Sequence, residues 1–595
     1  MRRDVETMVY EFKGFRLDRA ERRLLHHGRP VQLKPKIFDL LLYLVERQGQ
    51  LIEKDELMRE IWPNTIVEEN NITVSMSMLR KILGEDRGGR KFVETVARRG
   101  YRFVAEVREI SRDGSSSEAA VMSSGTAAVT PLPVREPPID SLAVFPVQKG
   151  GQLDVEYLSE GITESIINKL SQVPKLRVLA LSTVLRFKGT DVDPQEMGTL
   201  LNVGAVMIVR VIQLGETLII RSELVKTSDG SQIWGEQYER KSSDLLGIQD
   251  EIAKAIVESL KLKLTSEQQK RFTKRYTDNT EAYSLYLRGR YFWTKYSKAW
   301  VLKSIEAFKK AIEIDPSYAL AYCGMADAYF RLSNIHFPPR EVMPKAKLAA
   351  LKAVEIDENL AEAHSSLGLV RVYFDHDWHG ARIEFKKSLE LNPDLVSAHQ
   401  RYASLLCFLG HFEESINHYE HALTLDPFSL HLQTNLATNY YLMGQHETAI
   451  NLLEETLELE PDYMPTHFVL GCTYIQQGDL RKAIEEFQCI YRLDEEAYMA
   501  LGYMGYAYAL AGQRAEAQNL LGILTDISLR KYVSLYSIGM IHLGLGRTDE
   551  MIDILERLYQ ERNDWLVWLK VSPELRPLRD DPRFDDLLKR LGFVD

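Results

Sequence analysis

ENNITVSMSMLRKILG (69–84) and FVETVARRGYRFVAEV (92–107) together decide the fold of the N-terminal part of this chain. The apolar residues of the first stretch recur at i, i+4, i+7 and i+11, the stripe of an amphipathic helix: Ile72, Met76, Leu79 and Leu83. The second stretch has the pattern of two strands around a tight turn that carries Arg98 and Arg99. The sequence therefore predicts a helix followed by a β-hairpin with a basic tip.

Two further helices and a strand-rich segment are predicted ahead of this unit. Residues 33–45, LKPKIFDLLLYLV, place four apolar side chains on one helical face: Phe38, Leu41, Leu42 and Val45. Residues 55–62, DELMREIW, stop before Pro63 and offer two side chains to the core: Leu57 and Ile61. Strands are expected in YEFKGFRLD (10–18) and RRLLHHGRPVQL (22–33). Residues 1–108 are thus expected to form one α+β domain.

This order of elements resembles the winged helix-turn-helix effector domain of OmpR/PhoB-type response regulators through residues 9–107. The resemblance rests on three motifs: V-x-L-K-x-x-x-F-x-L-L (31–41), LRKILG (79–84) and TVARRGYRF (95–103). It implies that residues 69–83 are a recognition helix in the major groove of double-stranded DNA and that the hairpin tip, or wing, reaches the adjacent minor groove.

The resemblance also assigns individual contacts. Base edges are expected opposite Thr73, Val74 and Met78, and phosphates opposite Asn70, Asn71, Ser75, Ser77 and Arg80. The expected DNA-binding set is completed by Lys81, Thr95, Arg98, Arg99 and Arg102. Family members usually carry more arginine on this helix and an arginine where Ala97 stands. Since asparagine pairs with adenine and apolar groups contact the thymine methyl, an A·T-leaning site is a hypothesis.

The charge distribution agrees with a DNA-binding head. Residues 1–108 carry a net charge of +5, whereas residues 276–595 carry −14. A basic segment on an acidic chain indicates nucleic-acid binding by that segment alone. One such domain buries too little surface for tight specific binding, so a homodimer on DNA or a tandem site is expected.

A linker and an α/β domain are predicted next. Residues 109–138 are rich in Ser, Ala and Pro and are expected to be a flexible linker. In residues 139–275, short apolar runs (141–147, 176–181, 205–214) alternate with helical stretches such as 156–170, and a meander from 218 and a helix at 250–264 follow. SEGITESIINKL (159–170) and DGSQIWGEQY (229–238) resemble a TolB-like domain.

The last part of the chain repeats. Pro393, Pro427 and Pro461 are spaced by 34 residues, a period typical of paired helices. Turn glycines and small residues recur with the same spacing: Gly410, Gly444, Gly478 and Gly512; Ala403, Ala437, Gly471 and Gly505; Ser415, Ala449, Ala483 and Ala517. Residues 285–530 resemble the tetratricopeptide repeat family, with an insertion at 334–344. An all-α solenoid is expected over 276–595, with 576–593 as its cap.

The repeats predict a surface for a protein or peptide partner. Their concave face is expected to carry Tyr402, Tyr440, Tyr441, Tyr474, His399 and His431. A small ligand in the α/β domain is the alternative input.

Several classes of function have no support in the sequence. No nucleotide-binding, zinc-protease or hydrolase motif is present, so no catalytic residue, cofactor or metal is expected. Cys323, Cys407, Cys472 and Cys489 form no C-x-x-C pair and are expected to be packing residues. No membrane span, leader or preceding receiver domain is expected, which favours a cytoplasmic protein.

The combination resembles one-component bacterial transcription regulators of the CadC/ToxR/HilA kind. We therefore expect a multidomain, sequence-specific DNA-binding regulator. The alternative is a repeat-based scaffold whose head does not contact DNA sequence specifically.

Overall fold

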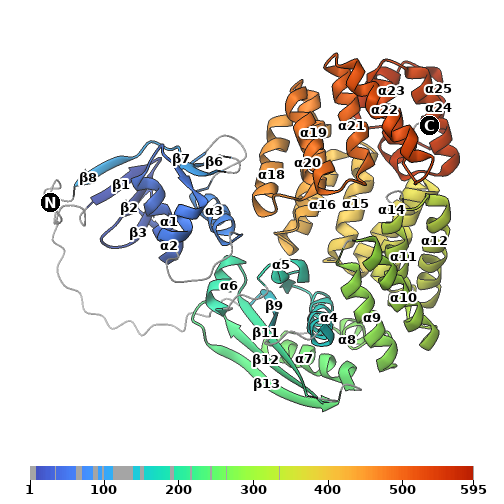
Figure 1. Cartoon of the computed structure of the whole chain (residues 1–595). Coiled ribbons are helices and arrows are strands. Elements are labelled where there is room, and N and C mark those ends of the chain that lie inside the picture. Colours follow the sequence, from blue (N-terminus) through green and yellow to red (C-terminus); the bar gives the residue numbers. More distant parts are fainter. Residues whose placement is uncertain are drawn as a thin grey trace, which may run out of the picture. The chain divides into compact units, whose positions relative to one another are not determined.

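The computed structural model describes residues 8–31, 33, 35–61, 70–84, 91–96, 99–111, 139–147, 153–187, 193–214, 217–241, 244–262, 264–295, 297–333 and 336–593. It divides into two compact units, residues 1–136 and residues 137–595, which are described separately (Figure 1). Of the predicted linker, residues 109–138, the part from 112 to 138 lies outside the described residues.

The first unit, the head, opens with an antiparallel sheet of strand order β4-β3-β2-β1-β8. Its strands are β1 (Met8–Phe12), β2 (Phe15–Asp18), β3 (Arg23–His26), β4 (Arg29–Val31) and β8 (Arg108–Ser111). Because β8 pairs with β1, from Met8↔Ser111 to Glu11↔Arg108, the head extends to Ser111, three residues beyond the predicted boundary.

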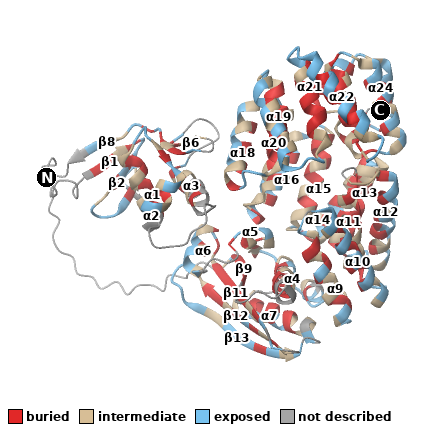
Figure 2. Ribbon diagram, in the orientation of Figure 1, coloured by how far each residue is buried: buried red, intermediate tan, exposed pale blue. Residues whose placement is uncertain are grey.

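Three helices and a second sheet complete the head. The helices are α1 (Pro35–Glu46), α2 (Lys54–Ile61) and α3 (Asn70–Leu83), and the sheet has the order β5-β7-β6, with β5 (Leu51–Glu53), β6 (Val93–Val96) and β7 (Gly100–Phe103). Every predicted core side chain of these helices is buried except Leu42, which is half-buried. The head has a hydrophobic core built only from its own residues (Figure 2).

The middle domain is a mixed sheet between two helical layers. The sheet order is β10-β9-β11-β12-β13, with β9 (Ser141–Val147), β10 (Arg177–Val178), β11 (Ala205–Leu214), β12 (Thr217–Lys226) and β13 (Gln232–Lys241). One face packs against α4 (Leu153–Leu170) and α7 (Leu245–Ser259), the other against α5 (Leu181–Leu185) and α6 (Pro194–Leu200); α8 (Ser266–Phe272) follows.

Two predicted elements of this domain are shorter than expected. The strand predicted at 176–181 pairs only at Arg177 and Val178, because helix α5 begins at Leu181. The helix predicted to run to Leu264 ends at Ser259, where the N–H of Leu260 caps it; Leu264 instead packs at the edge of the core.

The repeats are successive helix pairs. They comprise α9 (Thr280–Trp293), α10 (Lys298–Ile314), α11 (Ala319–Leu332), α12 (Pro339–Ile356), α13 (Ala361–Val370), η4 (Arg371–Asp375), α14 (Trp378–Leu391), α15 (Val396–Phe408), α16 (Phe412–Leu425), α17 (Leu430–Leu442), α18 (His446–Leu459), α19 (Met464–Gln477), α20 (Leu480–Leu493), α21 (Tyr498–Leu510), α22 (Arg514–Ser528), α23 (Leu535–Gly544) and α24 (Thr548–Glu561). The four predicted turn glycines have φ between +77° and +83°, which favours glycine. All eight predicted small residues are buried.

A side-chain clasp recurs in the repeats at positions 364, 399, 433 and 467. At each position a ring or amide Nε2 bonds the backbone carbonyl six residues earlier, at distances from 2.7 to 3.0 Å. The other end of the side chain contacts the second helix of the pair: Glu384 for His364, His418 for His399, Thr456 for Gln433 and Glu486 for His467. The clasp ties each interhelical turn to both helices of its repeat.

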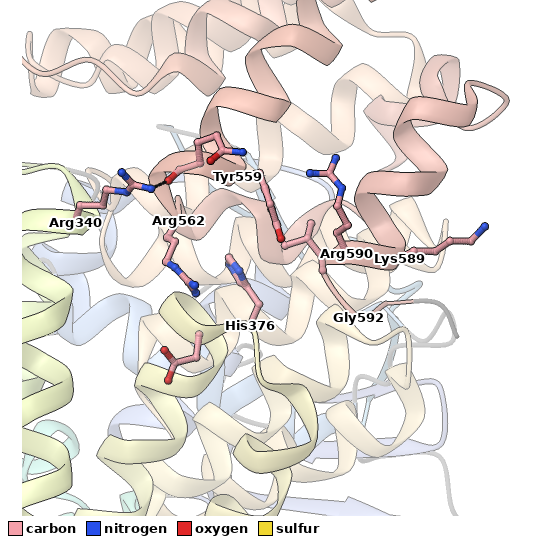
Figure 3. Close-up of a pocket in the computed structure, with 10 residues that line it drawn as sticks. Arg340, His376, Tyr559, Arg562, Lys589, Arg590 and Gly592 are labelled. Carbon is pink, nitrogen blue, oxygen red and sulfur yellow. Dashed lines mark hydrogen bonds between the residues drawn. The ribbon is translucent and has the colours of Figure 1, made fainter.

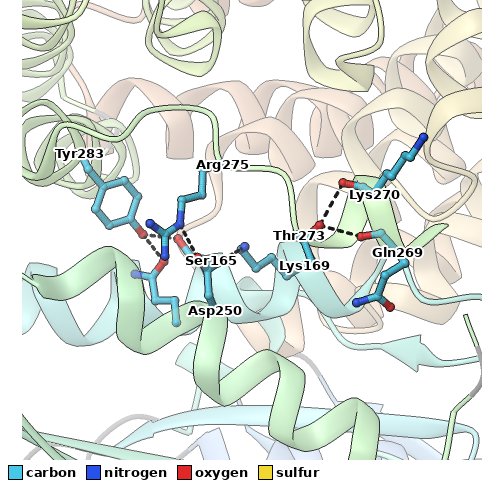
Figure 4. Close-up of polar contacts among 9 residues, drawn as sticks. Ser165, Lys169, Asp250, Gln269, Lys270, Thr273, Arg275 and Tyr283 are labelled. Carbon is cyan, nitrogen blue, oxygen red and sulfur yellow. Dashed lines mark hydrogen bonds and ion pairs between the residues drawn. The ribbon is translucent and has the colours of Figure 1, made fainter. Parts of the chain in front are cut away.

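The middle domain and the first repeat share one core. Buried side chains of α4, α7, α9 and α10 belong to the same hydrophobic cluster as the sheet. Polar contacts also join the middle domain to the first repeat (Figure 4). The Tyr283 hydroxyl lies 2.7 Å from Gln249 and 2.6 Å from Ser165. Asp250 pairs with Arg275 and with Lys169. The middle domain is therefore fixed to the repeats.

A second attachment lies at the turn between α16 and α17. The Asp426 carboxylate, only 5% exposed, accepts hydrogen bonds from Ser182 (2.5 Å) and Thr183 (2.6 Å) of helix α5. Beside it, the Ala180 N–H donates to the Leu425 carbonyl at 2.9 Å. The middle domain thus contacts the repeats at two places far apart in sequence.

The end of the chain folds back onto earlier repeats. It consists of η5 (Asp564–Trp568), η6 (Pro573–Leu578) and α25 (Pro582–Arg590). The Trp378 indole stacks on Phe593 and donates to the Leu591 carbonyl at 2.6 Å. The segment predicted as a terminal cap therefore also packs against α14, more than 200 residues earlier in the sequence.

Candidate nucleic-acid interface

Helix α3 packs against the core of the head through the apolar stripe that the sequence predicted. Ile72, Met76 and Leu79 are fully buried and Leu83 is 3% exposed. Because these four residues fix the rotation of the helix about its axis, they also fix which of its positions lie opposite the core.

The structure describes only part of the predicted DNA-binding set. Seven of its members lie within the bounds of α3, but their side chains are outside the described residues: Asn70, Asn71, Thr73, Val74, Ser77, Met78 and Lys81. Arg98 is likewise outside them. The described members are Ser75, Arg80, Thr95, Arg99 and Arg102.

Two described members of the set contact each other. Arg80 Nη2 of α3 donates to Thr95 Oγ1 at 2.5 Å and to the Val93 carbonyl at 3.2 Å, both on β6. A guanidinium forms charge-assisted hydrogen bonds that are roughly twice as strong as neutral ones. Arg80 therefore holds helix α3 and the hairpin in one geometry, a role that its helical position alone did not reveal.

The base of the hairpin depends on a close backbone approach. Gly100 pairs with Val96 across the hairpin and with Glu53 of β5. A Cβ on Gly100 would overlap the Ile52 carbonyl oxygen, so only glycine fits here. This glycine lets β7 lie between β5 and β6.

The two described wing arginines differ in their surroundings. Arg102 pairs with Glu94 across the hairpin, with Nη1 3.2 Å from Oε2. Arg99 is exposed, and its backbone N–H donates to the Val96 carbonyl at 2.9 Å. Among the described residues, the Arg99 side chain has no hydrogen-bond or ion-pair partner, so its charge is available to a phosphate backbone.

The expected partner surface on the repeats is largely filled by the chain itself. Tyr402, Tyr441, Tyr474 and His399 are 6 to 8% exposed, Tyr440 is half-buried and His431 is exposed. The Tyr441 hydroxyl donates to the buried Glu574 of η6, and Trp568 of η5 packs edge-on against Phe408 at 4.6 Å. The sequence missed this contact because it joins segments more than 100 residues apart.

Within the described ranges, no helix combines the length and apolar composition needed to cross a membrane. No group of three or more His, Cys, Asp or Glu side chains in that part of the chain is arranged to hold a metal ion. The four cysteines are free and buried, as packing residues would be.

Comparison with protein families gives matches for the head and for the repeats. The family "Transcriptional regulatory protein, C terminal" matches residues 28–103, which span β4 to β7. Tetratricopeptide repeat families match residues 303–333, 394–461, 428–496 and 532–564. The TolB-like resemblance of the middle domain has no counterpart among these matches.

Three curated proteins show the range of relatives. The transcriptional regulator HilA of Salmonella typhimurium (strain LT2) is 26% identical over 429 residues, which cover 71% of each protein. The putative adenylate cyclase 3 of Rhizobium meliloti is 27% identical over 240 residues, 40% of this chain and 41% of the relative. The transcriptional activator CadC of Escherichia coli is 29% identical over 123 residues, 20% of this chain and 24% of CadC. The chain therefore carries an OmpR/PhoB-type transcriptional regulatory domain at its N-terminus, joined to tetratricopeptide repeats, and is a homologue of the regulators HilA and CadC.

Proposed function

We propose that this chain is a one-component transcription regulator whose head binds double-stranded DNA sequence-specifically. The bond from Arg80 to Thr95 carries the proposal, because it joins the helix and the hairpin that would contact the two grooves. Preorganised contacts of this kind lower the free-energy penalty of ordering on binding. The family match at residues 28–103 supports the same assignment.

Helix α3 enters the major groove in this proposal, with Thr73, Val74 and Met78 at base edges. Asn70, Asn71, Ser75, Ser77 and Lys81 lie at phosphates, as do the wing residues Arg98, Arg99 and Arg102. Arg80 and Thr95 act chiefly by positioning the helix against the hairpin. Because a single head buries little DNA surface, two copies bind as a homodimer or at tandem half-sites.

The signal enters through the second unit. A protein partner on the exposed surface of the repeats is one route, and a small ligand is the other. No catalytic step is assigned, although one relative is named as a putative cyclase. Since bacterial promoters lie in the cytoplasm, the regulator acts there.

Site selection from a random duplex library tests the proposal. Residues 1–111 and the full chain are compared at low and near-physiological salt, because phosphate contacts make binding steeply salt-dependent. The shorter fragment ends at Ser111 so that β8 is kept. Enrichment of one common motif is expected; the absence of any motif from both samples would favour the scaffold alternative.

Arg99→Ala provides the matching variant, with Arg16→Ala as its control. Both arginines are exposed, and Arg16 lies on β2, in the other sheet of the head. Loss of the Arg99 charge is expected to weaken binding to the selected duplex and to lower its salt dependence by about one phosphate contact. Equal binding by the two variants would contradict a wing contact.

A further inference from the structure

A cavity of about 340 Å³ lies where the end of the chain meets the insertion helix of the repeats (Figure 3). Arg340 of α12 and Asp375 and His376 after α13 line one side. The other side is formed by Tyr559, Gln560, Arg562, Lys589, Arg590, Leu591 and Gly592. The two sides come from segments about 200 residues apart, and both belong to the second unit.

Two guanidinium groups of this cavity have no carboxylate partner among the described residues. Arg340 donates to the Gln560 carbonyl, and Arg562 Nη1 donates to the Phe374 carbonyl at 3.1 Å. Each guanidinium has five N–H donors, so most donors of both remain for another acceptor. The positive charges of the two arginines are therefore not compensated by a carboxylate in this cavity.

The other charges of the lining are largely neutralised. Lys589 pairs with Asp585 at 2.7 Å, and Figure 3 shows its side chain extending away from His376. Arg590 pairs with Glu556 and, at 2.8 Å, with Asp586. Asp375, the carboxylate of the lining, is paired with Lys347 at 2.8 Å. The net positive charge of the cavity therefore comes chiefly from Arg340 and Arg562.

His376 adds a buried polar atom that lacks a partner. Its Nε2 has no hydrogen bond in the structure and is shielded from solvent. Burial and the charge of Arg562 lower the His376 pKa to about 4, so the ring is neutral near pH 7. A neutral imidazole can donate one hydrogen bond to an anion. Buried polar atoms without a partner are rare in native proteins, and a ligand is one explanation for such an atom.

We propose that this cavity binds a phosphate-bearing small molecule, held by Arg340 and Arg562 with His376 as a further donor. Guanidinium groups match the oxygens of phosphate with paired hydrogen bonds, which favours phosphate over a monovalent inorganic ion. A cavity of 340 Å³ is at the lower end of the range for small-molecule sites, roughly 300–1,000 Å³, and exceeds what one phosphate group needs.

Such a ligand would join the end of the chain to α12 and η4. A ligand that binds only the folded chain raises its stability with ligand concentration, so binding would strengthen the contact between the end of the chain and the second and third helix pairs of the repeats. This inference supplies a small-molecule input for the proposed regulator. The site itself does not depend on DNA binding by the head.

Thermal unfolding and titration calorimetry of the full chain with pyrophosphate test the inference. Inorganic phosphate is the smaller probe, and sodium chloride at equal ionic strength controls for screening. Arg340→Gln and Arg562→Gln are compared with Arg530→Gln, an exposed arginine of the same unit outside the cavity. Each cavity variant is expected to bind pyrophosphate about tenfold more weakly, the loss of one charge-assisted hydrogen bond.

Two results would overturn the inference: no binding by the unmodified chain, or equal weakening in all three variants. Arg340→Lys guards against a folding defect, since it keeps the charge but loses the paired donors. It should retain the wild-type unfolding temperature without ligand and still bind pyrophosphate more weakly than the unmodified chain. Wild-type affinity in Arg340→Lys would contradict the paired geometry. Because the readout is independent of DNA, failure here leaves the proposed function standing.

Discussion

The substitution His399→Gln should make the stability of the repeats less sensitive to acid pH. The His399 side chain is 8% exposed, and its pKa falls to about 4 because burial disfavours the charged ring, with His421 and His418 adding repulsion. Glutamine can keep the clasp, since Gln433 holds the equivalent position and bonds the Pro427 carbonyl at 3.0 Å. The substitution therefore changes titration more than geometry.

The sign and size of the change in the free energy of unfolding follow from the difference in the His399 pKa between the folded and the unfolded chain. An imidazole with a lowered folded-state pKa takes up its proton preferentially in the unfolded chain, so stability is full above pH 6.5 and lost as the pH falls toward 4. A difference of 6.5 against about 4 corresponds to about 3 kcal/mol. His399→Gln should therefore gain stability relative to the unmodified chain between pH 6.5 and 4.

Urea unfolding of the full chain at pH 7.5 and pH 5 measures this difference, with hydrogen exchange of residues 396–425 locating it. His364→Gln is the matched control with the opposite sign. Burial lowers the His364 pKa, but the hydrogen bonds to Glu384 and to the Glu358 carbonyl, together with the charge of Glu384, outweigh it and leave the pKa raised. This histidine therefore stabilises the fold at acid pH and loses that effect as the pH rises. Parallel pH profiles for both variants and the unmodified chain would refute the reasoning.

Three further substitutions test contacts that join distant segments. Gly100→Ala should destabilise residues 1–111 by about 2 kcal/mol in urea unfolding, because the methyl group overlaps the Ile52 carbonyl; wild-type stability would contradict that overlap. Asp426→Ala should leave two hydroxyl groups of α5 unpaired, cost about 2 kcal/mol and speed hydrogen exchange in α5, whereas unchanged exchange would refute the attachment. Glu574→Gln should gain stability relative to the unmodified chain as the pH rises above 4.5, because burial raises the Glu574 pKa; a pH-independent difference would contradict this.

Local periodicity predicted most of the secondary structure. The stripe from Ile72 to Leu83 and the 34-residue spacing of the turn glycines are properties of one helix or one repeat, and both are confirmed. Strand β8 was assigned to the linker because its partner, β1, lies about 100 residues away. Register between distant strands is a tertiary property, which a short window of sequence does not contain.

The sequence predicted the candidate nucleic-acid interface only in part. The sequence located the helix and the hairpin, but it assigned Arg80 and Thr95 to DNA and missed the bond between them. It also placed Tyr402 and Tyr441 on an open groove, whereas both are buried, and Tyr441 donates to Glu574 near the end of the chain. The clasp was detectable in principle, since His364, His399, Gln433 and His467 share the spacing of the repeats.

Base recognition by α3 is the central claim, and a change of selected motif tests it most directly. Site selection is repeated with Val74→Ala and with Met78→Ala in residues 1–111, and Arg16→Ala serves as the surface control. We expect each α3 variant to lose preference at particular base pairs of the motif while Arg16→Ala enriches the original one, because a base contact affects one position. An unchanged motif in both α3 variants, with binding intact, would contradict base recognition by this helix.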